Sequence, residues 1–374
     1  MRELTSAKQE LHREEMVINM GPQHPSTHGV LRAVVTLEGE TVRGVDPVIG
    51  YLHRCFEKIC EQKTWTQVIP YTDRTDYVAA LTNELAYVLA VEKLMGLEVP
   101  ERAQYIRVIM AELQRIASHL LWFGTFGNDL GAFTPFLYAF RERETLIDIF
   151  EKTTGARLTY NYIRLGGVRN DLPADFERET LAFLEKLEKG LEEYHNLLIG
   201  NAIFEYRTKG LGVLTAEQAV AWGASGPTLR ASGVAWDLRK SEPYLVYDRF
   251  DFEVPVGQKG DIYDRCICRM KEMEESAKIV RQALEGLPEG DVVGKVPRVI
   301  KPPQGQAYAA VEAPRGELGC FVVSDGGIKP YRVKWRSPCF VHLQLLDVIA
   351  RGELVADFIA NIGSIDIILG EVDR

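Results

Sequence analysis

The chain of 374 residues contains no Cys-x-x-Cys pair, no long uninterrupted apolar run and no excess of basic charge. Its six cysteines are scattered, and Cys266 and Cys268 stand too close together for an ordinary zinc pair. We therefore expect reduced, mostly buried thiols and no bound metal. The formal charge of −9 argues against a nucleic-acid partner.

Segments that could suggest a membrane span or a nucleotide site are each interrupted. Between Ile116 and Phe140 the only formally charged residue is Asp129, but glycines and a proline break this run near its middle. No Gly-x-Gly-x-x-Gly follows a predicted strand, so we expect no NADH site on this chain. The start of the chain is charged and lacks a secretory signal. The chain is predicted to be soluble, or held at a membrane by other proteins.

Hydrophobic periodicity predicts an α+β fold, in which a small N-terminal β-sheet region lies on a large helical core. Strands are expected at residues 16–20, 31–37 and 41–49, and helices at 52–62, 72–95, 101–123, 135–154, 173–199 and 261–284. After a proline-rich connection, strands are expected at 307–313, 320–324 and 331–333, and short helices at 338–349 and 353–362. We divide the chain into an N-terminal β region (1–50), a helical core (51–285) and a C-terminal strand and helix segment (286–374).

Two histidines stand in a loop rich in glycine and proline. Residues 21–32 read Gly-Pro-Gln-His-Pro-Ser-Thr-His-Gly-Val-Leu-Arg, and this composition places His24 and His28 on a tight connection between strands. Imidazole can handle a proton or a polar ligand near neutral pH. The alternative is a solvated hairpin tip whose histidines have no chemical role.

A tyrosine and an aspartate are further candidates. Tyr77 falls inside the helix expected at 72–95, where its phenol could donate a hydrogen bond and then a proton to a carbonyl oxygen. The alternative is a core tyrosine bonded to the backbone. Asp129 lies at the glycine-rich break of an apolar region, so its carboxylate must find partners. It could orient a histidine, or it could cap the helix that follows.

Short blocks spread along almost the whole chain form a specific pattern. Besides residues 21–32, they are Gly50-Tyr51-Leu52-His53-Arg54, Pro70-Tyr71-Thr72-Asp73-Arg74-Thr75-Asp76-Tyr77, Tyr105-Ile106-Arg107-Val108-Ile109, Glu112-Leu113-Gln114-Arg115-Ile116-Ala117-Ser118-His119-Leu120, Trp236-Asp237-Leu238-Arg239, Glu312-Ala313-Pro314-Arg315-Gly316-Glu317 and Gly370-Glu371-Val372-Asp373-Arg374. Together they resemble the quinone-site subunit of respiratory complex I, the D subunit of the NADH-quinone oxidoreductases. The resemblance extends from about residue 17 to residue 374.

More distant relatives of that family are the large subunits of nickel–iron hydrogenases, which hold their metals through two Cys-x-x-Cys pairs. Here the early position reads Asp73-Arg74-Thr75-Asp76 and the late position reads Ser364-Ile365-Asp366-Ile367-Ile368. The missing thiolates argue against hydrogenase activity. The resemblance therefore implies a hydrogenase-large-subunit-like fold whose former metal cavity has room for a quinone ring.

The resemblance also implies roles for individual residues. Tyr77 and His28 would hold the quinone head group, Asp129 would bond to His28, and His24 would lie on the same loop. Arg54 would lie near an iron–sulfur cluster held by a neighbouring subunit, whereas the alternative for Arg54 is a surface salt bridge to Glu57. Cys55 stands where the family usually has glycine, and a positive φ at this position would strain it.

Partners and location follow from the same resemblance. We expect this chain to take part in a proton-pumping NADH:quinone oxidoreductase, with quinone as substrate and no metal or NADH of its own. Its partners would be the cluster-bearing B subunit, the C and I subunits, and the H subunit in the membrane, on the cytoplasmic side of the cell membrane. The alternatives are the equivalent subunit of a ferredoxin-dependent or hydrogenase-type membrane complex, and a structural scaffold.

Overall fold

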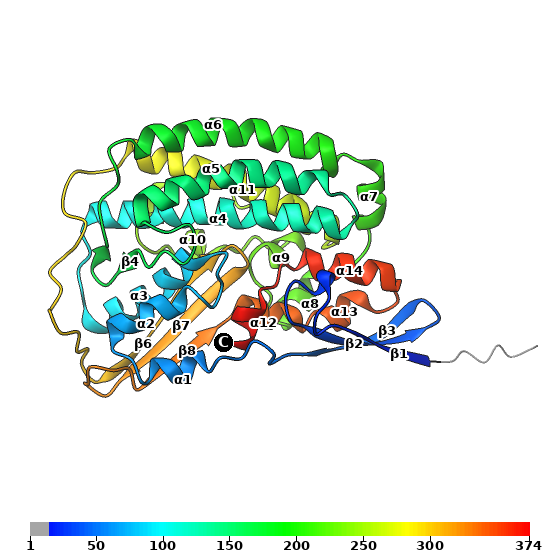
Figure 1. The fold of residues 1–374 in the computed structure, drawn as a ribbon, viewed down its shortest axis with the longest axis horizontal. Helices are drawn as coiled ribbons and strands as arrows, with labels where there is room; N and C mark the ends of the chain where they lie inside the picture. Colours follow the sequence, from blue (N-terminus) through cyan, green and yellow to red (C-terminus); the bar gives the residue numbers. More distant parts are fainter. Residues whose placement is uncertain (1–14) are drawn as a thin grey trace, which may run out of the picture.

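In the computed structural model, residues 15–374 are described. The first 14 residues of the predicted N-terminal β region therefore lie outside the described residues. Figure 1 shows a stack of long helices above two separate sheets, with the last helices of the chain between the sheets. The predicted α+β class, with a small sheet region at each end of a helical core, is confirmed.

The N-terminal sheet is antiparallel, with β1 (Glu15–Met20), β2 (Arg32–Glu38) and β3 (Thr41–Val48) in that order. Side chains of β2 alternate between buried and partly exposed, as the sequence predicted for a strand with one covered face. The loop with His24 and His28 connects β1 to β2, so the sheet fixes both of its ends.

Four helices form the main bundle, α4 (Glu101–Asp129), α5 (Thr134–Thr154), α6 (Phe176–Tyr194) and α11 (Ile262–Glu285). Helix α4 contacts α5 and α11 within the bundle, and α3 (Ala80–Met95) and α14 (Val355–Ser364) outside it. Neighbours on all sides explain why α4 is buried almost all round rather than along one stripe. Within residues 15–374, no helix is both long enough and apolar enough to cross a bilayer.

The second sheet follows the bundle in sequence and contains β6 (Gly305–Ala313), β7 (Gly316–Ser324) and β8 (Arg332–Arg336), all antiparallel. Helix α3 (Ala80–Met95) lies across β6 and β7, and α1 (Phe56–Cys60) lies against β8. The remaining elements are α2 (Trp65–Thr72), β4 (Ile163–Arg164), β5 (Gly167–Val168), the single turns η1 (Pro25–Thr27), η2 (His195–Ile199) and η3 (Tyr247–Arg249), α7 (Ala202–Thr208), α8 (Ala216–Ala221), α9 (Gly226–Ala231), α10 (Leu238–Ser241), α12 (Pro338–Leu343), α13 (Leu346–Ala350), α14 (Val355–Ser364) and α15 (Leu369–Asp373).

Two hydrophobic cores organise these elements. The larger core joins the bundle to α3 and the β6–β8 sheet. The smaller core joins the buried face of the N-terminal sheet, including Val35, to helices near the end of the chain, including Phe358 and Leu369. Burial of apolar surface therefore holds two sequence-distant parts of the chain together.

The helix predicted at 72–95 is wrong in its first part. Helix α2 ends at Thr72, α3 begins at Ala80, and Tyr77 lies in the turns between them. Side chains in this segment bond to nearby backbone: the Thr75 hydroxyl donates to the Thr72 carbonyl, and an Asp76 carboxylate oxygen accepts from the Val78 N–H. Such local bonds compete with helical ones.

The predicted break near Asp129 is displaced. Helix α4 continues through Gly124 and Gly127 and ends at Asp129, so the break follows the aspartate. A Cβ atom at Gly124 would lie 3.1 Å from the Phe136 backbone, so this glycine permits close packing of α5 on α4. The N-cap position of α5 is Phe133, and Asp129 therefore does not cap that helix.

Cys55 has φ 56° and ψ 34°, the left-handed conformation in which a side chain is disfavoured. We expect Cys55→Gly to raise the free energy of unfolding by about 1 kcal/mol, because glycine has no Cβ atom to strain. Thermal unfolding of the full chain measures this gain. Cys55→Ala is the matched control, since it also removes the thiol but keeps the Cβ atom. Equal midpoints for the two variants would contradict the strain argument.

Candidate functional site

The histidine loop is closed by its own hydrogen bonds. Thr27 is fully buried, and its hydroxyl lies 2.8 Å from the His24 carbonyl oxygen and 3.0 Å from that of Gly29. His28 follows η1 with φ 52°, a left-handed conformation that turns the chain sharply. The loop is therefore a defined structure that holds His28 in one position.

His28 and Asp129 form the closest pair in the site. Nε2 of His28 lies 2.5 Å from Oδ2 of Asp129, and their side chains are 13% and 8% exposed. The end of α4 carries the aspartate to the histidine loop across 101 residues of sequence. The carboxylate favours a ring with a proton on Nε2, which leaves Nδ1 for another partner. The expected contact between Asp129 and His28 is present.

His24 has a structural task in the same loop. Its Nδ1 accepts a hydrogen bond from the Ser26 N–H at 3.2 Å, at the N-cap position of η1. This bond leaves Nε2 of the half-buried ring for other partners.

Tyr77 is 41% exposed, in the turns between α2 and α3. Partial burial and the neighbouring Asp76 carboxylate raise the pKa of its phenol above 10. The hydroxyl therefore keeps its proton at neutral pH and can donate it to a hydrogen-bond acceptor.

A buried arginine joins the segment before Tyr77 to the segment before α15. One Arg315 nitrogen lies 2.8 Å from an Asp76 carboxylate oxygen, and another lies 3.3 Å from an Asp366 carboxylate oxygen. Burial lowers the pKa of this guanidinium, but the carboxylates of Asp366 and Asp76 outweigh that effect and raise it. In residues 15–374, no group of three or more His, Cys, Asp or Glu side chains could hold a metal ion.

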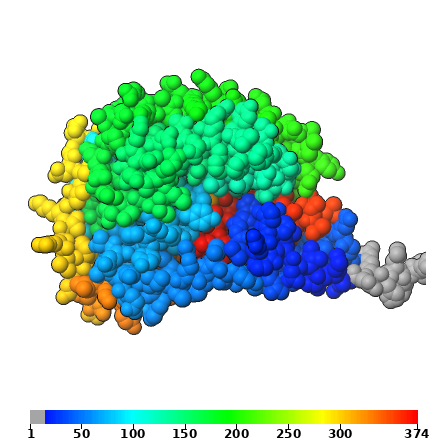
Figure 2. Space-filling model, in the orientation of Figure 1, coloured from blue at the N-terminus to red at the C-terminus, as the bar shows by residue number. Residues whose placement is uncertain are grey.

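Helix α15 connects the histidine loop to the Tyr77 turn. A Cβ atom on Gly29 would lie 3.2 Å from the side chain of Leu369, and one on Gly370 would lie 2.8 Å from the Thr75 carbonyl oxygen. Because Leu369 and Gly370 are consecutive, both loops pack on one short helix. Figure 2 shows this last part of the chain, in red, in a hollow between the N-terminal region and the helices.

Arg54 lies beside the Tyr77 turn. Its guanidinium donates to the Arg74 carbonyl oxygen at 2.5 Å, and both arginines line a surface pocket of 460 Å³ with Phe56, Ile59, Pro70 and Tyr71. Glu57 instead pairs with Arg332 and Lys334, so the alternative of an Arg54–Glu57 salt bridge is wrong. A pocket with cationic and apolar walls is left open to a neighbour.

Three residues of this site, Arg315, Asp366 and Glu371, were not predicted from the sequence. The one local signal is at Asp366, a carboxylate within the apolar run Ile365–Ile368. Glu371 on α15 is buried and accepts a hydrogen bond from the Cys339 N–H at 3.2 Å. Burial and the nearby Asp76 raise its pKa to about 7.

The core also contains a buried ionic network, and five of its members come from blocks that carried the family resemblance. Its members are fully buried or nearly so and alternate in charge, namely Glu112, Arg115, Arg230, Asp237, Arg239, Glu272 and Glu312. The network connects α4, α9, α10, α11 and β6. It explains why so many charged residues in those blocks are structural rather than chemical.

Comparison with known families agrees with this architecture. The family model of nickel-dependent hydrogenases matches residues 54–127, and the model described as respiratory-chain NADH dehydrogenase, 49 kDa subunit, matches residues 129–302 and 295–374. The helical core thus has a hydrogenase-large-subunit-like fold.

Full-length relatives narrow this class. The chain is 57% identical to an NADH-quinone oxidoreductase D subunit of Symbiobacterium thermophilum, the second of that name, with 96% of this chain and 98% of the relative covered. It is 54% identical to the D subunits of Bacillus mycoides and of Bacillus anthracis, with 96% and 99% covered in each case. The chain belongs to the family of NADH-quinone oxidoreductase D subunits, and it is a complex I subunit.

The Arg315 bridge predicts a strong stability effect. Arg315→Met leaves two buried carboxylates without their partner and should lower the free energy of unfolding by about 3–5 kcal/mol. Thermal or denaturant unfolding of the full chain measures the loss. Arg351→Met is the control, because it breaks an exposed ion pair with Asp347 and should cost less than about 1 kcal/mol. Similar losses in both variants would contradict a special role for the bridge.

Glu371 predicts a pH dependence of stability. Its folded pKa of about 7 lies above the ordinary value of 4.5, so its contribution is most favourable at low pH and declines as pH rises through 7. Between pH 4.5 and about 7 the decline in the free energy of unfolding amounts to about 3 kcal/mol. Glu371→Gln should remove this decline. Unfolding midpoints of both proteins from pH 4.5 to 8 test it. A constant difference between the two proteins across that range would refute the assignment.

Proposed function

We propose that this chain binds quinone in the hollow beside α15 and reduces it with electrons from an iron–sulfur cluster in a neighbouring subunit. The observation that carries the proposal is that two loops bearing proton-carrying groups pack on one helix. The histidine loop meets Leu369 through Gly29, and the Tyr77 turn meets Gly370 through Thr75, while His28 is held by Asp129. The hollow between them has the polar donors that a quinone carbonyl needs.

The reaction adds two electrons and two protons to quinone to give quinol. Tyr77 donates a hydrogen bond to one carbonyl oxygen and then its phenolic proton. His28 donates the second proton to the other carbonyl oxygen, and Asp129 holds the His28 ring and stabilises its charged form during the transfer. His24 lies on the same loop and contacts the quinone as it enters. The electrons arrive one at a time from the neighbour's cluster.

Arg54 and Arg74 support the electron supply in this proposal. Their guanidinium groups border the open pocket beside the Tyr77 turn. Positive charge near a cluster stabilises its reduced state, because the added electron makes the cluster more negative. The cluster-bearing subunit therefore docks at this pocket.

The same proposal assigns partners and location. The neighbours are the B subunit, which carries the cluster, the C and I subunits, and the H subunit in the membrane. They hold this chain as a peripheral subunit on the cytoplasmic side of the cell membrane, where quinone reduction drives proton translocation. Oxidation of NADH rather than ferredoxin by the purified complex tests the electron donor.

Tyr77→Phe tests the site directly. The variant keeps the ring and loses the hydroxyl, so quinone reduction by the purified complex should fall about 10²-fold or more. NADH oxidation with ferricyanide as acceptor should stay normal, because electron entry does not involve Tyr77. Tyr331→Phe, in a connection where the ring is 68% exposed, is the matched control. Normal quinone turnover in an intact Tyr77→Phe complex would instead favour a structural scaffold.

A further inference from the structure

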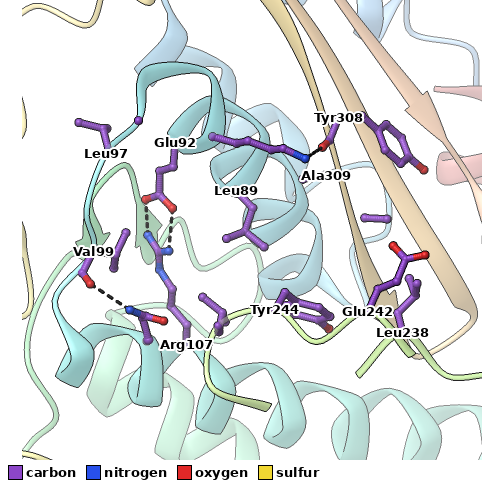
Figure 3. A pocket seen from close by; sticks show the side chains of 15 residues that line it. Leu89, Glu92, Leu97, Val99, Arg107, Leu238, Glu242, Tyr244, Tyr308 and Ala309 are labelled. Carbon is purple, nitrogen blue, oxygen red and sulfur yellow. Dashed lines mark hydrogen bonds and ion pairs between the residues drawn. The ribbon is translucent and has the colours of Figure 1, made fainter. Parts of the chain in front are cut away.

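A separate pocket, which shares no lining residue with the proposed quinone site, lies at the free edge of the β6–β8 sheet. It has a volume of 510 Å³, and Figure 3 shows its walls, formed by the end of α3, the start of α4, the segment after α10, and β6. Strand β6 is at the edge because the strand order is β6-β7-β8. A sheet edge bears backbone groups that can bind another strand.

Hydrogen bonding shows which β6 residues face away from β7. The β6–β7 hairpin has the two-residue turn Pro314–Arg315, so Ala313 lies opposite Gly316. Along an antiparallel pair, residues whose backbone bonds to the opposite strand alternate with residues whose backbone points away from it. Glu312 is unbonded to β7, because its N–H donates to the Tyr244 hydroxyl at 3.1 Å. Its opposite residue, Glu317, likewise donates its N–H to the Ser225 hydroxyl. By alternation, Tyr308 and Ala310 also face outward.

Most of the polar groups in the pocket are already paired. Arg107 makes two bonds to the Glu92 carboxylate, at 2.6 and 2.9 Å, and Lys93 donates to the Tyr308 carbonyl oxygen at 3.2 Å (Figure 3). Among the described residues, the outward N–H of Tyr308 and both backbone groups of Ala310 have no such bond. Few charged side chains in the pocket are therefore free to bind an ion, but β6 offers a short row of backbone donors and acceptors.

We propose that an extended segment of another complex I subunit adds to β6 as a further strand in this pocket. Its backbone bonds to Tyr308 and Ala310, and an apolar side chain lies against Leu89 and Leu245. The exposed Glu242 carboxylate at the rim favours a basic residue in that segment. The proposal goes beyond the quinone site and requires only that the chain is part of the complex.

Amide hydrogen exchange in the purified complex tests the added strand without a mutation. The Ala310 N–H has no acceptor among residues 15–374, so an empty edge would exchange within about tenfold of the rate in an unfolded peptide. A bound strand should slow that exchange by about 100-fold or more. Fast exchange at Ala310 in the intact complex would overturn the proposal, whatever the activity of the quinone site.

A pair of variants identifies the occupant. Ala310→Pro removes the outward N–H, and proline is tolerated on edge strands, whereas Ala310→Val adds bulk but keeps the donor. A photoreactive benzoylphenylalanine in place of the exposed Gln306 should cross-link to one other subunit of the purified complex. That cross-link should drop at least tenfold with Ala310→Pro and persist with Ala310→Val. Cross-linking only to a second copy of this chain, or equally in both variants, would overturn the proposal.

Discussion

The salt bridge of Arg315 with Asp76 and Asp366 holds the proposed site together. The arginine stands at the two-residue turn between β6 and β7, so the tip of this hairpin places its guanidinium between two otherwise separate segments. Two buried carboxylates would repel each other, and the guanidinium between them converts that repulsion into attraction. The Arg315 side chain is essentially inaccessible to water, so the two carboxylates depend all the more on its charge.

This bridge sets the surroundings of α15. Asp366 precedes that helix, and Asp76 precedes Tyr77, so one arginine fixes the segments on either side of the hollow. Burial, and after it the negative charge of Asp76, raises the pKa of both Tyr77 and Glu371. The Asp76 carboxylate therefore both takes part in the salt bridge and makes Tyr77 and Glu371 hold their protons more tightly. On the opposite side, the end of α4 supplies Asp129 to His28.

Much of the fold could be predicted because the relevant signals are local. Alternation in β2 and in the later part of β7 reports burial directly, and helical periodicity locates α4 although that helix is buried almost all round. The turn at Tyr77 was not predicted, because it depends on hydrogen bonds from threonine and aspartate side chains to nearby backbone. Hydrophobic periodicity carries no information about such bonds. The sequence predicts a break at Gly124 and Gly127, but both glycines permit close packing of a neighbouring helix. Periodicity cannot predict this role, because it does not show which helix packs there. Arg315 was missed because its two partners are 239 and 51 residues away.

The Asp373 carboxylate accepts hydrogen bonds from the Gly50 and Leu52 N–H groups, at sequence separations of 323 and 321 residues. A ribosome adds residues in order, so α15, which packs on the histidine loop and on the Tyr77 turn, emerges long after Gly50 and Leu52. The hollow beside α15 therefore closes late relative to the N-terminal sheet, and loop-closure entropy over such separations is substantial. A nascent chain therefore exposes its apolar N-terminal sheet without the helices that cover it, and this interval is when a chaperone or a partner subunit would be most useful to the protein.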